Sequence, residues 1–283
     1  MMIFLLILCV ILLILIAAAL LRSGWEQKHF IVREYSLPAE GAECGFRAAV
    51  LADLHEAVFG RENEELIRAI DRFAPDLILI PGDFITCRRD TETAEEPDLS
   101  LLRTLASRYP VYYAPGNHEE NYLKLHPEYA DEVADTGAVF LVDKMVTADL
   151  GSSIVHVSGI TLGEDYYVRG KQPQMPVEFV EEKLGPCPEE YTILLAHNPG
   201  FFKTYARWGC NCVISGHNHG GVIRLPLLGG VMSASMHLFD RYDRGIFKEG
   251  RSTMVLSAGL GMHTIHVRLF NRPELVVISF GEE

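Results

Sequence analysis

Side chains that can bind metal ions gather in five short motifs along this chain of 283 residues. In chain order, the motifs are Asp53-Leu54-His55, Gly82-Asp83, Gly116-Asn117-His118-Glu119, the single residue His197, and Gly216-His217-Asn218-His219-Gly220. They offer carboxylate oxygens, an amide oxygen and imidazole nitrogens, and they contain no thiolate. This mixture of donors suits Mn²⁺, Fe or Zn²⁺. The ordered set predicts a ligand shell for two metal ions.

Each motif by itself also has an ordinary structural explanation. An Asp-x-His or Gly-Asp sequence after a strand is commonly a turn, because Asp bonds to nearby backbone and Gly tolerates a positive φ. His197 alone would more often be a buried histidine with a hydrogen-bond partner. The last motif is more specific, because two imidazoles two residues apart on a glycine-flanked loop can converge on one cluster. Five unrelated turns in this order are a poor explanation.

Apolar runs precede the motifs and predict the elements that carry them. The expected strands are Arg47 to Ala52, Leu77 to Pro81, Val111 to Pro115, Thr192 to Ala196 and Cys212 to Ser215. Helices are expected at Glu64 to Phe73, where apolar residues recur at helical spacing, and at Asp98 to Arg108. Alternating strands and helices indicate a largely parallel sheet. Ligands bind beyond the carboxyl ends of such strands, where these motifs fall.

Later segments favour strands with few helices between them. These are Ser153 to Ile160, Gly221 to Leu225, Thr253 to Ser257 and Glu274 to Phe280. The change of pattern predicts a second, mixed sheet.

The five motifs in this order resemble the calcineurin-like metallophosphoesterase superfamily, from about Phe46 to the C-terminus. The resemblance implies an α/β fold, an αββα sandwich of two mixed sheets flanked by helices, with the metals at one edge. Two later stretches, Gly259-Leu260-Gly261 and Asn271-Arg272-Pro273-Glu274-Leu275, are similar to a membrane-anchored bacterial branch that includes UDP-diacylglucosamine hydrolases and related phosphodiesterases.

The resemblance also implies roles for the motif residues. One metal would be held by Asp53, His55 and His219, the other by Asn117, His197 and His217, and Asp83 would bridge the two. Such a pair activates a water for in-line attack and clamps the phosphoryl oxygens, so the reaction would proceed by attack of metal-bound hydroxide. His118 would protonate the leaving oxygen. Glu119 would either orient the His118 ring or be an exposed loop acid.

Three residues near the C-terminus have less specific expectations. Arg268 would contact a substrate phosphate through bidentate hydrogen bonds, with a structural ion pair as the alternative. His263 and His266 are expected to be ordinary polar residues.

The first 21 residues contain no charged side chain and are almost wholly apolar. As a helix they would reach about 30 Å, the thickness of a hydrocarbon core, which predicts a transmembrane anchor at 1–21. A cleaved signal peptide is the alternative, because Ala17 to Ala19 offer small residues for cleavage. We therefore expect an anchor, a juxtamembrane segment at 22–45 and a catalytic domain at 46–283. Arg22, Lys28 and Arg33 follow the span, which points the domain towards the cytoplasm.

Cysteine usage agrees with a reducing compartment. Outside the apolar segment, the cysteines are Cys44, Cys87, Cys187, Cys210 and Cys212. Their odd number and irregular spacing do not indicate a disulfide scaffold, so free thiols are expected.

The net charge of −13, from 38 acidic residues against 25 Lys plus Arg, disfavours nucleic acid as a partner, since no basic stripe is present. The function predicted is therefore di-metal hydrolysis of a phosphodiester or pyrophosphate bond in a lipid-linked or envelope substrate. Two alternatives stay open: a phosphatase of a soluble small molecule or nucleotide, and a non-catalytic binding protein on the same fold.

Overall fold

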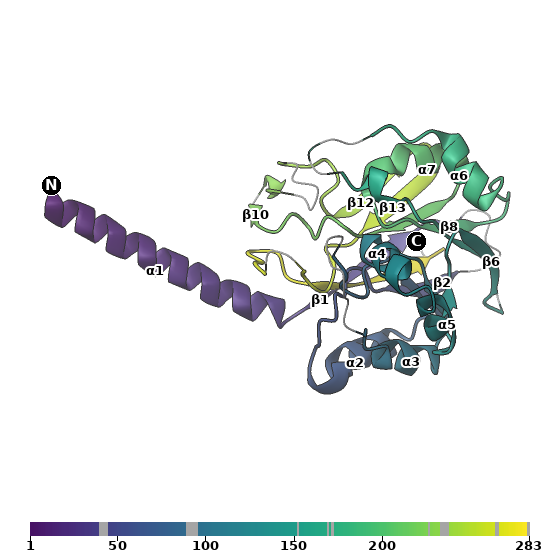
Figure 1. The fold of residues 1–283 in the computed structure, drawn as a ribbon, viewed down its shortest axis with the longest axis horizontal. Helices are drawn as coiled ribbons and strands as arrows, with labels where there is room; N and C mark the ends of the chain where they lie inside the picture. The colour runs from purple at the N-terminus through teal and green to yellow at the C-terminus, as the bar shows by residue number, and fades with distance from the viewer. Residues whose placement is uncertain are drawn as a thin grey trace.

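Two six-stranded sheets stack face to face among the described residues of the computed structural model, and helices cover their outer faces (Figure 1). The structure describes residues 1–39, 45–88, 96–151, 153–168, 170, 173–225, 227–232, 238–263 and 266–281. Cys44 therefore lies outside the described residues. The layers run helix, sheet, sheet, helix, which is the predicted α/β sandwich of two mixed sheets.

The first sheet has the strand order β1-β14-β2-β3-β4-β5. The bounds are β1 Ile31–Leu37, β14 Glu274–Phe280, β2 Phe46–Val50, β3 Leu77–Ile80, β4 Val111–Tyr113 and β5 Val139–Phe140. Strands β2 to β5 are parallel, β14 runs antiparallel to β2, and β1 is parallel to β14.

The second sheet has the order β12-β13-β9-β8-β7-β6. The bounds are β12 Gly245–Glu249, β13 Ser252–Leu256, β9 Cys212–Ser215, β8 Thr192–Leu195, β7 Ile154–Gly159 and β6 Lys144–Asp149. Its four central strands are parallel, and the two outer strands are antiparallel to their neighbours. Both sheets are mixed.

Alternation along the buried strands builds the core on both faces of each sheet. In β3, Leu77 and Leu79 face the second sheet, while Ile78 and Ile80 face the helices, and all four side chains are fully buried. A strand with both faces covered needs apolar residues at every position, which is why these strands are continuous apolar runs.

Helices complete the outer layers. Those packed on the first sheet are α2 Glu64–Phe73, α3 Ser100–Ala106, α4 Asn117–Leu125 and α5 Tyr129–Ala134, and those on the second are α6 Val177–Leu184 and α7 Phe202–Trp208. The prediction of a helix at Glu64 to Phe73 is confirmed, with Leu66 and Ile70 buried on its inner face.

Two expectations about strands need correction. The strand at 274–280 forms, but it lies in the first sheet between β1 and β2, where both of its faces are covered. Only Arg224–Leu225 of the segment 221–225 is a strand, β10, and it pairs with β11 at Gly229–Gly230. The segment 22–45, expected to be juxtamembrane, contributes β1 to the first sheet.

The N-terminal helix α1, Met2–Gln27, extends away from the sandwich (Figure 1). Among the described residues it is the one helix long and apolar enough to cross a membrane, by length and composition. Its last turn is different, because Ser23 and Glu26 are buried against the sandwich. The Ser23 hydroxyl accepts the amide N–H of Arg268 at 3.0 Å, and the Glu26 carboxylate accepts that of Asn271 at 3.0 Å.

Candidate metal centre

The five motifs meet at one edge of the sandwich because each follows the carboxyl end of a parallel strand. Strands β2, β3 and β4 are neighbours in the first sheet, and β8 and β9 are neighbours in the second. The motifs begin three residues or fewer beyond these ends: Asp53 after β2, Gly82 after β3, Gly116 after β4, His197 after β8 and Gly216 after β9. The predicted gathering of the site is therefore what the topology produces.

Five of the expected ligands have a left-handed backbone conformation. Their φ angles are 46° at Asp53, 45° at His55, 52° at Asp83, 71° at His217 and 48° at His219. Residues other than Gly rarely adopt this backbone conformation, and each such residue costs about 1–3 kcal/mol of free energy. Such strain collects at functional sites, where the surrounding structure enforces it.

Two glycines let the motif loops come within contact of the carboxylates. A Cβ atom on Gly116 would collide with the Asp83 carboxylate, and one on Gly216 would collide with that of Asp53. Glycine is therefore required at both positions for close approach, beyond any need for a turn.

The Asp83 carboxylate lies at the centre of the cluster. Its Oδ2 atom is 2.9 Å from His197 Nε2, 3.8 Å from His55 Nε2 and 4.0 Å from His118 Nε2. Its Oδ1 atom accepts the amide N–H of His118 at 3.0 Å, which fixes the orientation of the group. One oxygen thus faces imidazoles from both halves of the site, as a bridging ligand must.

Asp53 has a similar place on the other side of His197. Its Oδ1 atom accepts the amide N–H of His217 at 2.9 Å and lies 3.7 Å from His197 Nε2 and 3.8 Å from His219 Nε2. Its Oδ2 atom is buried and has no hydrogen-bond partner.

Six polar atoms of the expected ligand set are buried without a hydrogen-bond partner. They are Asp53 Oδ2, His55 Nε2, Asn117 Oδ1, His197 Nε2 and both ring nitrogens of His219. Leaving one such atom unpaired costs about 1–3 kcal/mol, so this concentration needs a compensating cation. The donor set fits two divalent ions.

A contact between His197 and the backbone shows which ring nitrogen carries the proton and which faces the site. His197 Nδ1 lies 3.1 Å from the carbonyl oxygen of Pro81, and since a carbonyl only accepts, Nδ1 carries a proton. In a neutral ring Nε2 then presents a lone pair to Asp83. A lone pair and a carboxylate oxygen 2.9 Å apart require a cation between them, either a proton or a metal ion. Metal-binding histidines are commonly oriented by a carbonyl in this way.

The electrostatics of the protein without metals agree with this requirement. Burial disfavours the charged form of His197, but the Asp83 and Asp53 carboxylates outweigh it and raise the pKa of His197 to about 9. Burial also disfavours ionised Asp83, yet His197 and His118 hold its pKa well below the usual range. Burial raises the pKa of Asp53 to about 7.

The other expected imidazole ligands are neutral. Burial lowers the pKa of His217 to about 3 and holds the pKa values of His55 and His219 well below their ordinary value. Their lone pairs are therefore available for a metal across the physiological pH range.

Glu119 has neither of the roles expected for it. Its side chain is fully buried and contacts main-chain amides. The His118 ring is instead oriented by a hydrogen bond from the amide of Cys87. The carboxylate accepts the N–H groups of Asp83 (2.8 Å), Phe84 (2.8 Å), Ile85 (3.1 Å) and Gly116 (2.7 Å), and the hydroxyl of Tyr113 (2.7 Å). Glu119 therefore positions the loop that carries the bridging Asp83.

The His118 ring is oriented by the backbone. Its Nδ1 atom accepts the amide N–H of Cys87 at 2.8 Å, so the neutral ring carries its proton on Nε2, the atom that faces Asp83. The ring is buried at the centre of the cluster.

Arg268 is placed where it cannot bind a substrate phosphate. Its side chain is fully buried, and its Nη2 group donates to the carbonyl oxygens of Ala258 at 2.9 Å, Gly259 at 3.1 Å and Gly261 at 2.9 Å. Both Nη groups donate to backbone carbonyls, while Nε has no hydrogen-bond partner among the described residues. The phosphate contact expected from the sequence is therefore corrected to a structural role, with bonds to carbonyls in place of the alternative ion pair.

Two residues beside the cluster were not indicated as functional by the sequence. The His263 ring lies 4.6 Å from that of His55, between ring centres, and the Tyr167 ring lies 5.2 Å from that of His217. His266, expected to be ordinary, is exposed. A histidine two residues beyond Gly259-Leu260-Gly261 was the available signal for His263, and Tyr167 had none.

The sequence of this chain is similar to those of known phosphoesterases. Residues 46–221 match the family model described as calcineurin-like phosphoesterase. An uncharacterized metallophosphoesterase of Bacillus subtilis, YkuE, is 25% identical over 240 residues, 83% of this chain and 79% of that protein. A Bos taurus protein named transmembrane protein with metallophosphoesterase domain is 27% identical over 254 residues, 81% of this chain and 51% of that protein. This chain thus spans about half the length of the bovine relative.

A search of solved structures returned distant neighbours. The crystal structure of a phosphopantetheinyl hydrolase from Mycobacterium tuberculosis aligns with a TM-score of 0.41 at 15% identity, covering 76% of this chain and 89% of that one.

Replacing Asp83 by Asn should abolish tight binding of the metal pair. The change keeps the shape of the side chain but removes the negative charge shared by the two halves of the site, so two dications would face each other unscreened. Elemental analysis of purified full-length protein should find two metals per chain in the wild type and in the exposed control Asp131→Asn. Two tightly bound metals in Asp83→Asn would contradict the bridge.

Metal binding should release protons at neutral pH. With pKa values of about 9 and 7, His197 is protonated at pH 7 and Asp53 is half protonated. Both must lose their protons to bind a cation, so roughly one to two protons should leave per chain and metal affinity should rise between pH 7 and 9. Calorimetric titration of Mn²⁺ in buffers of different ionisation enthalpy measures this number. Affinity that is constant or falls as the pH rises would refute the assignment.

Proposed function

The chain belongs to the calcineurin-like phosphoesterase family and is a metal-dependent phosphoester hydrolase, and from this premise we propose that it cleaves a phosphodiester or pyrophosphate bond in a lipid-linked or envelope substrate. The observation that carries the catalytic part is the group of six buried polar atoms without hydrogen-bond partners in the expected ligand set. Soft ligands are absent from this group, in agreement with hard or borderline divalent ions.

Seven residues divide into two ligand sets in this proposal. Asp53, His55 and His219 would hold one ion, Asn117, His197 and His217 would hold the other, and Asp83 would be shared by the two sets. When bound, two adjacent divalent ions supply an activated water and neutralise charge on the phosphoryl oxygens. Mn, Fe and Zn all suit the donors. The clusters Asp83, His197 and His217, and His55, Asp83 and His118, each bring one possible ligand atom per residue within 4.8 Å of one another.

His118 would interact with the leaving oxygen of the substrate. The resemblance implied that it transfers a proton, which would require a second proton on Nδ1. That proton would face the N–H of Cys87 across 2.8 Å, where two donors repel each other. The bond from Cys87 therefore supports a neutral ring that stabilises the departing oxygen by a hydrogen bond from Nε2.

Two substitutions at His118 separate hydrogen bonding from proton transfer. A Gln side chain can donate a hydrogen bond from nearly the position of Nε2 but cannot give up a proton, whereas Ala can do neither. We expect His118→Ala to lose about 10²- to 10³-fold in turnover on a diester with an alkoxide leaving group, and His118→Gln to lose about tenfold.

Metal content serves as the control in this experiment, and both variants should keep two ions. Equal losses in the Gln and Ala variants would favour proton transfer. Loss of a metal from either would make His118 a ligand. On a nitrophenyl diester, whose leaving group departs without assistance, both variants should stay close to wild type.

The docked end of α1 supports a substrate in or on a membrane. The segment that receives Ser23 and Glu26 also contacts the site, because the Asn271 side chain donates to the carbonyl oxygen of His219 at 2.7 Å. If α1 spans a bilayer over residues 1–21, the site lies within a short distance of the membrane surface. Arg22, Lys28 and Arg33 follow the span and favour the cytoplasmic face.

Exposed apolar side chains next to the end of α1 give further support. The Arg22 guanidinium lies over the Phe270 ring at 5.1 Å, and Leu269 bridges to Ile223, which leads into the β10–β11 hairpin. The tip of that hairpin carries Leu227, 106% exposed. A leucine so exposed at a loop tip would gain free energy where that tip met the bilayer interface.

Substitution of Leu227 tests the lipid substrate against a soluble one. In full-length protein reconstituted into vesicles, Leu227→Asp should lower hydrolysis of a phosphodiester lipid about tenfold while leaving a soluble nitrophenyl diester unaffected, because only the first reaction needs the hairpin at the membrane. Ile154→Asp is the matched control, since Ile154 is 53% exposed at the start of β7, the end opposite the site. Equal rates of the Leu227 variant and wild type on the lipid, with faster hydrolysis of a soluble nucleotide, would favour the soluble-substrate alternative.

A further inference from the structure

The Tyr167 hydroxyl is buried beside the metal centre without a partner. Its ring centre lies 5.2 Å from that of His217 and 6.3 Å from that of His197, two expected ligands of the same ion. Among the described residues, no atom forms a hydrogen bond with this hydroxyl. A buried hydroxyl left unpaired costs free energy, so its position beside a phosphoester site indicates a partner that arrives with the substrate.

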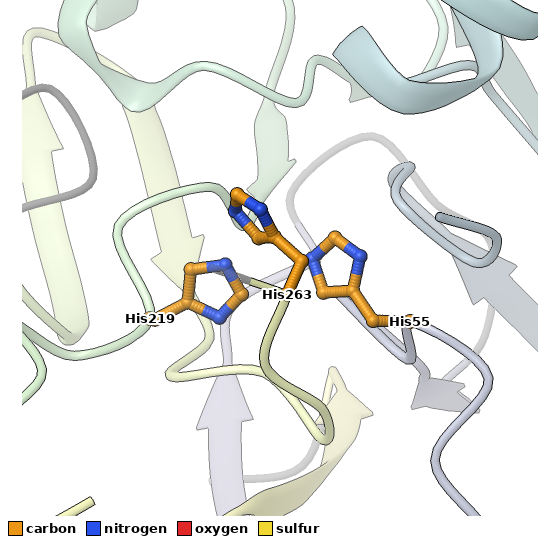
Figure 2. A group of neighbouring side chains, drawn as sticks. All are labelled: His55, His219 and His263. Atoms are coloured by element: carbon orange, nitrogen blue, oxygen red, sulfur yellow. The ribbon is translucent and has the colours of Figure 1, made fainter. Parts of the chain in front are cut away.

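His263 occupies a corresponding place beside the other half of the centre. Figure 2 shows its ring next to those of His55 and His219, on a separate loop. The ring centre of His263 lies 4.6 Å from that of His55, 4.5 Å from that of His118 and 5.5 Å from that of His219. The other three imidazoles are buried, whereas His263 is partly exposed.

The loop that carries His263 is fastened to the motif after β2. The amide of Gly261 donates to the carbonyl oxygen of Asp53 at 2.6 Å, and a Cβ atom at Gly261 would collide with the backbone of Leu54. Arg268 holds the same loop from the other side through three carbonyl oxygens, and Arg88 donates to the carbonyl oxygen of His263 at 3.1 Å. The imidazole is thus placed by the fold.

His263 could be a further metal ligand, since His55, His219 and His263 each offer a nitrogen within 4.8 Å of the others. Two observations favour substrate instead. The ion beside His55 already has four buried donors in Asp53, His55, Asp83 and His219, and a catalytic ion needs an open position. His263 is also the partly exposed member of the group, so its ring is accessible to a molecule from solvent.

We propose that Tyr167 and His263 are substrate-binding residues that donate hydrogen bonds to the phosphoryl group from opposite halves of the metal centre. This inference rests on the proposed phosphoester hydrolysis. At neutral pH a phenol keeps its proton and a neutral imidazole has one N–H to donate, so both groups suit an anionic phosphoryl oxygen. Neither residue supplies charge, which leaves neutralisation of the phosphate to the ions.

Inorganic phosphate is the probe, with full-length protein loaded with Mn²⁺ in detergent. The variants are Tyr167→Phe, which removes only the hydroxyl, and His263→Ala and His263→Gln, where Gln keeps a donor. Controls are Tyr166→Phe on the neighbouring residue, whose ring packs against those of Phe179 and Phe201, and His266→Ala on the exposed histidine of the same loop. Elemental analysis gives the metal content, calorimetry gives the Kd for phosphate, and the melting temperature monitors folding.

We expect two Mn²⁺ per chain in every variant. The Kd for phosphate should rise about 10-fold in Tyr167→Phe and about 10- to 100-fold in His263→Ala, with His263→Gln between His263→Ala and wild type, and both controls unchanged. A wild-type Kd in folded Tyr167→Phe and His263→Ala, with both metals present, would overturn the inference and leave the proposed hydrolysis intact. Loss of a metal in His263→Ala would overturn it for His263 and make that residue a ligand. Wild-type protein that holds two Mn²⁺ yet neither binds phosphate nor cleaves any phosphoester would instead defeat the proposed function, and the inference with it.

Discussion

Two buried carboxylates, Asp83 and Asp53, share a space of a few ångströms with the imidazoles of His197, His55 and His219, and this arrangement is stable only with cations among them. Burying charged and polar groups without partners is costly, and several atoms of this cluster have no hydrogen-bond partner among the described residues. Three features keep the ligand side chains in position. They are the left-handed backbone at the ligands, the glycines beside the carboxylates and the five hydrogen bonds to Glu119. The protein provides the geometry, and metal ions bound there would provide the free energy that compensates the burial of these polar groups.

The order of motifs along the chain was sufficient to predict the cluster, because each ligand follows a strand that is apolar on both faces and parallel strands end at one edge. The same local patterns could not predict pairings between distant segments. β14 inserts between β1 and β2 because both of its faces are apolar, yet nothing local specifies its neighbours. Glu119 was expected either to orient the His118 ring or to be an exposed loop acid, because its actual partners are mainly backbone amides, which carry no side-chain signature. Arg268 was misassigned for the same reason, because a guanidinium that binds three carbonyls leaves no pattern in the sequence.

The helix α1 and the catalytic site share one segment of chain. Residues Arg268 and Asn271 receive the buried end of α1 through their amides, while their side chains hold the Gly259–Gly261 loop and the carbonyl of His219. A flexible linker would let the domain turn freely relative to the helix. These contacts instead fix the direction in which the helix leaves the sandwich, so the orientation of the site relative to a membrane would be set by the fold.

In the proposed metal centre, the Asp83 carboxylate is shared by two ions. Anomalous diffraction from crystals of the Mn²⁺-loaded protein, recorded at the manganese absorption edge, tests this claim directly. Two peaks should appear, one beside His55 and His219 and the other beside His197 and His217, with the Asp83 carboxylate in contact with both. A single peak, or two peaks of which Asp83 touches only one, would contradict it.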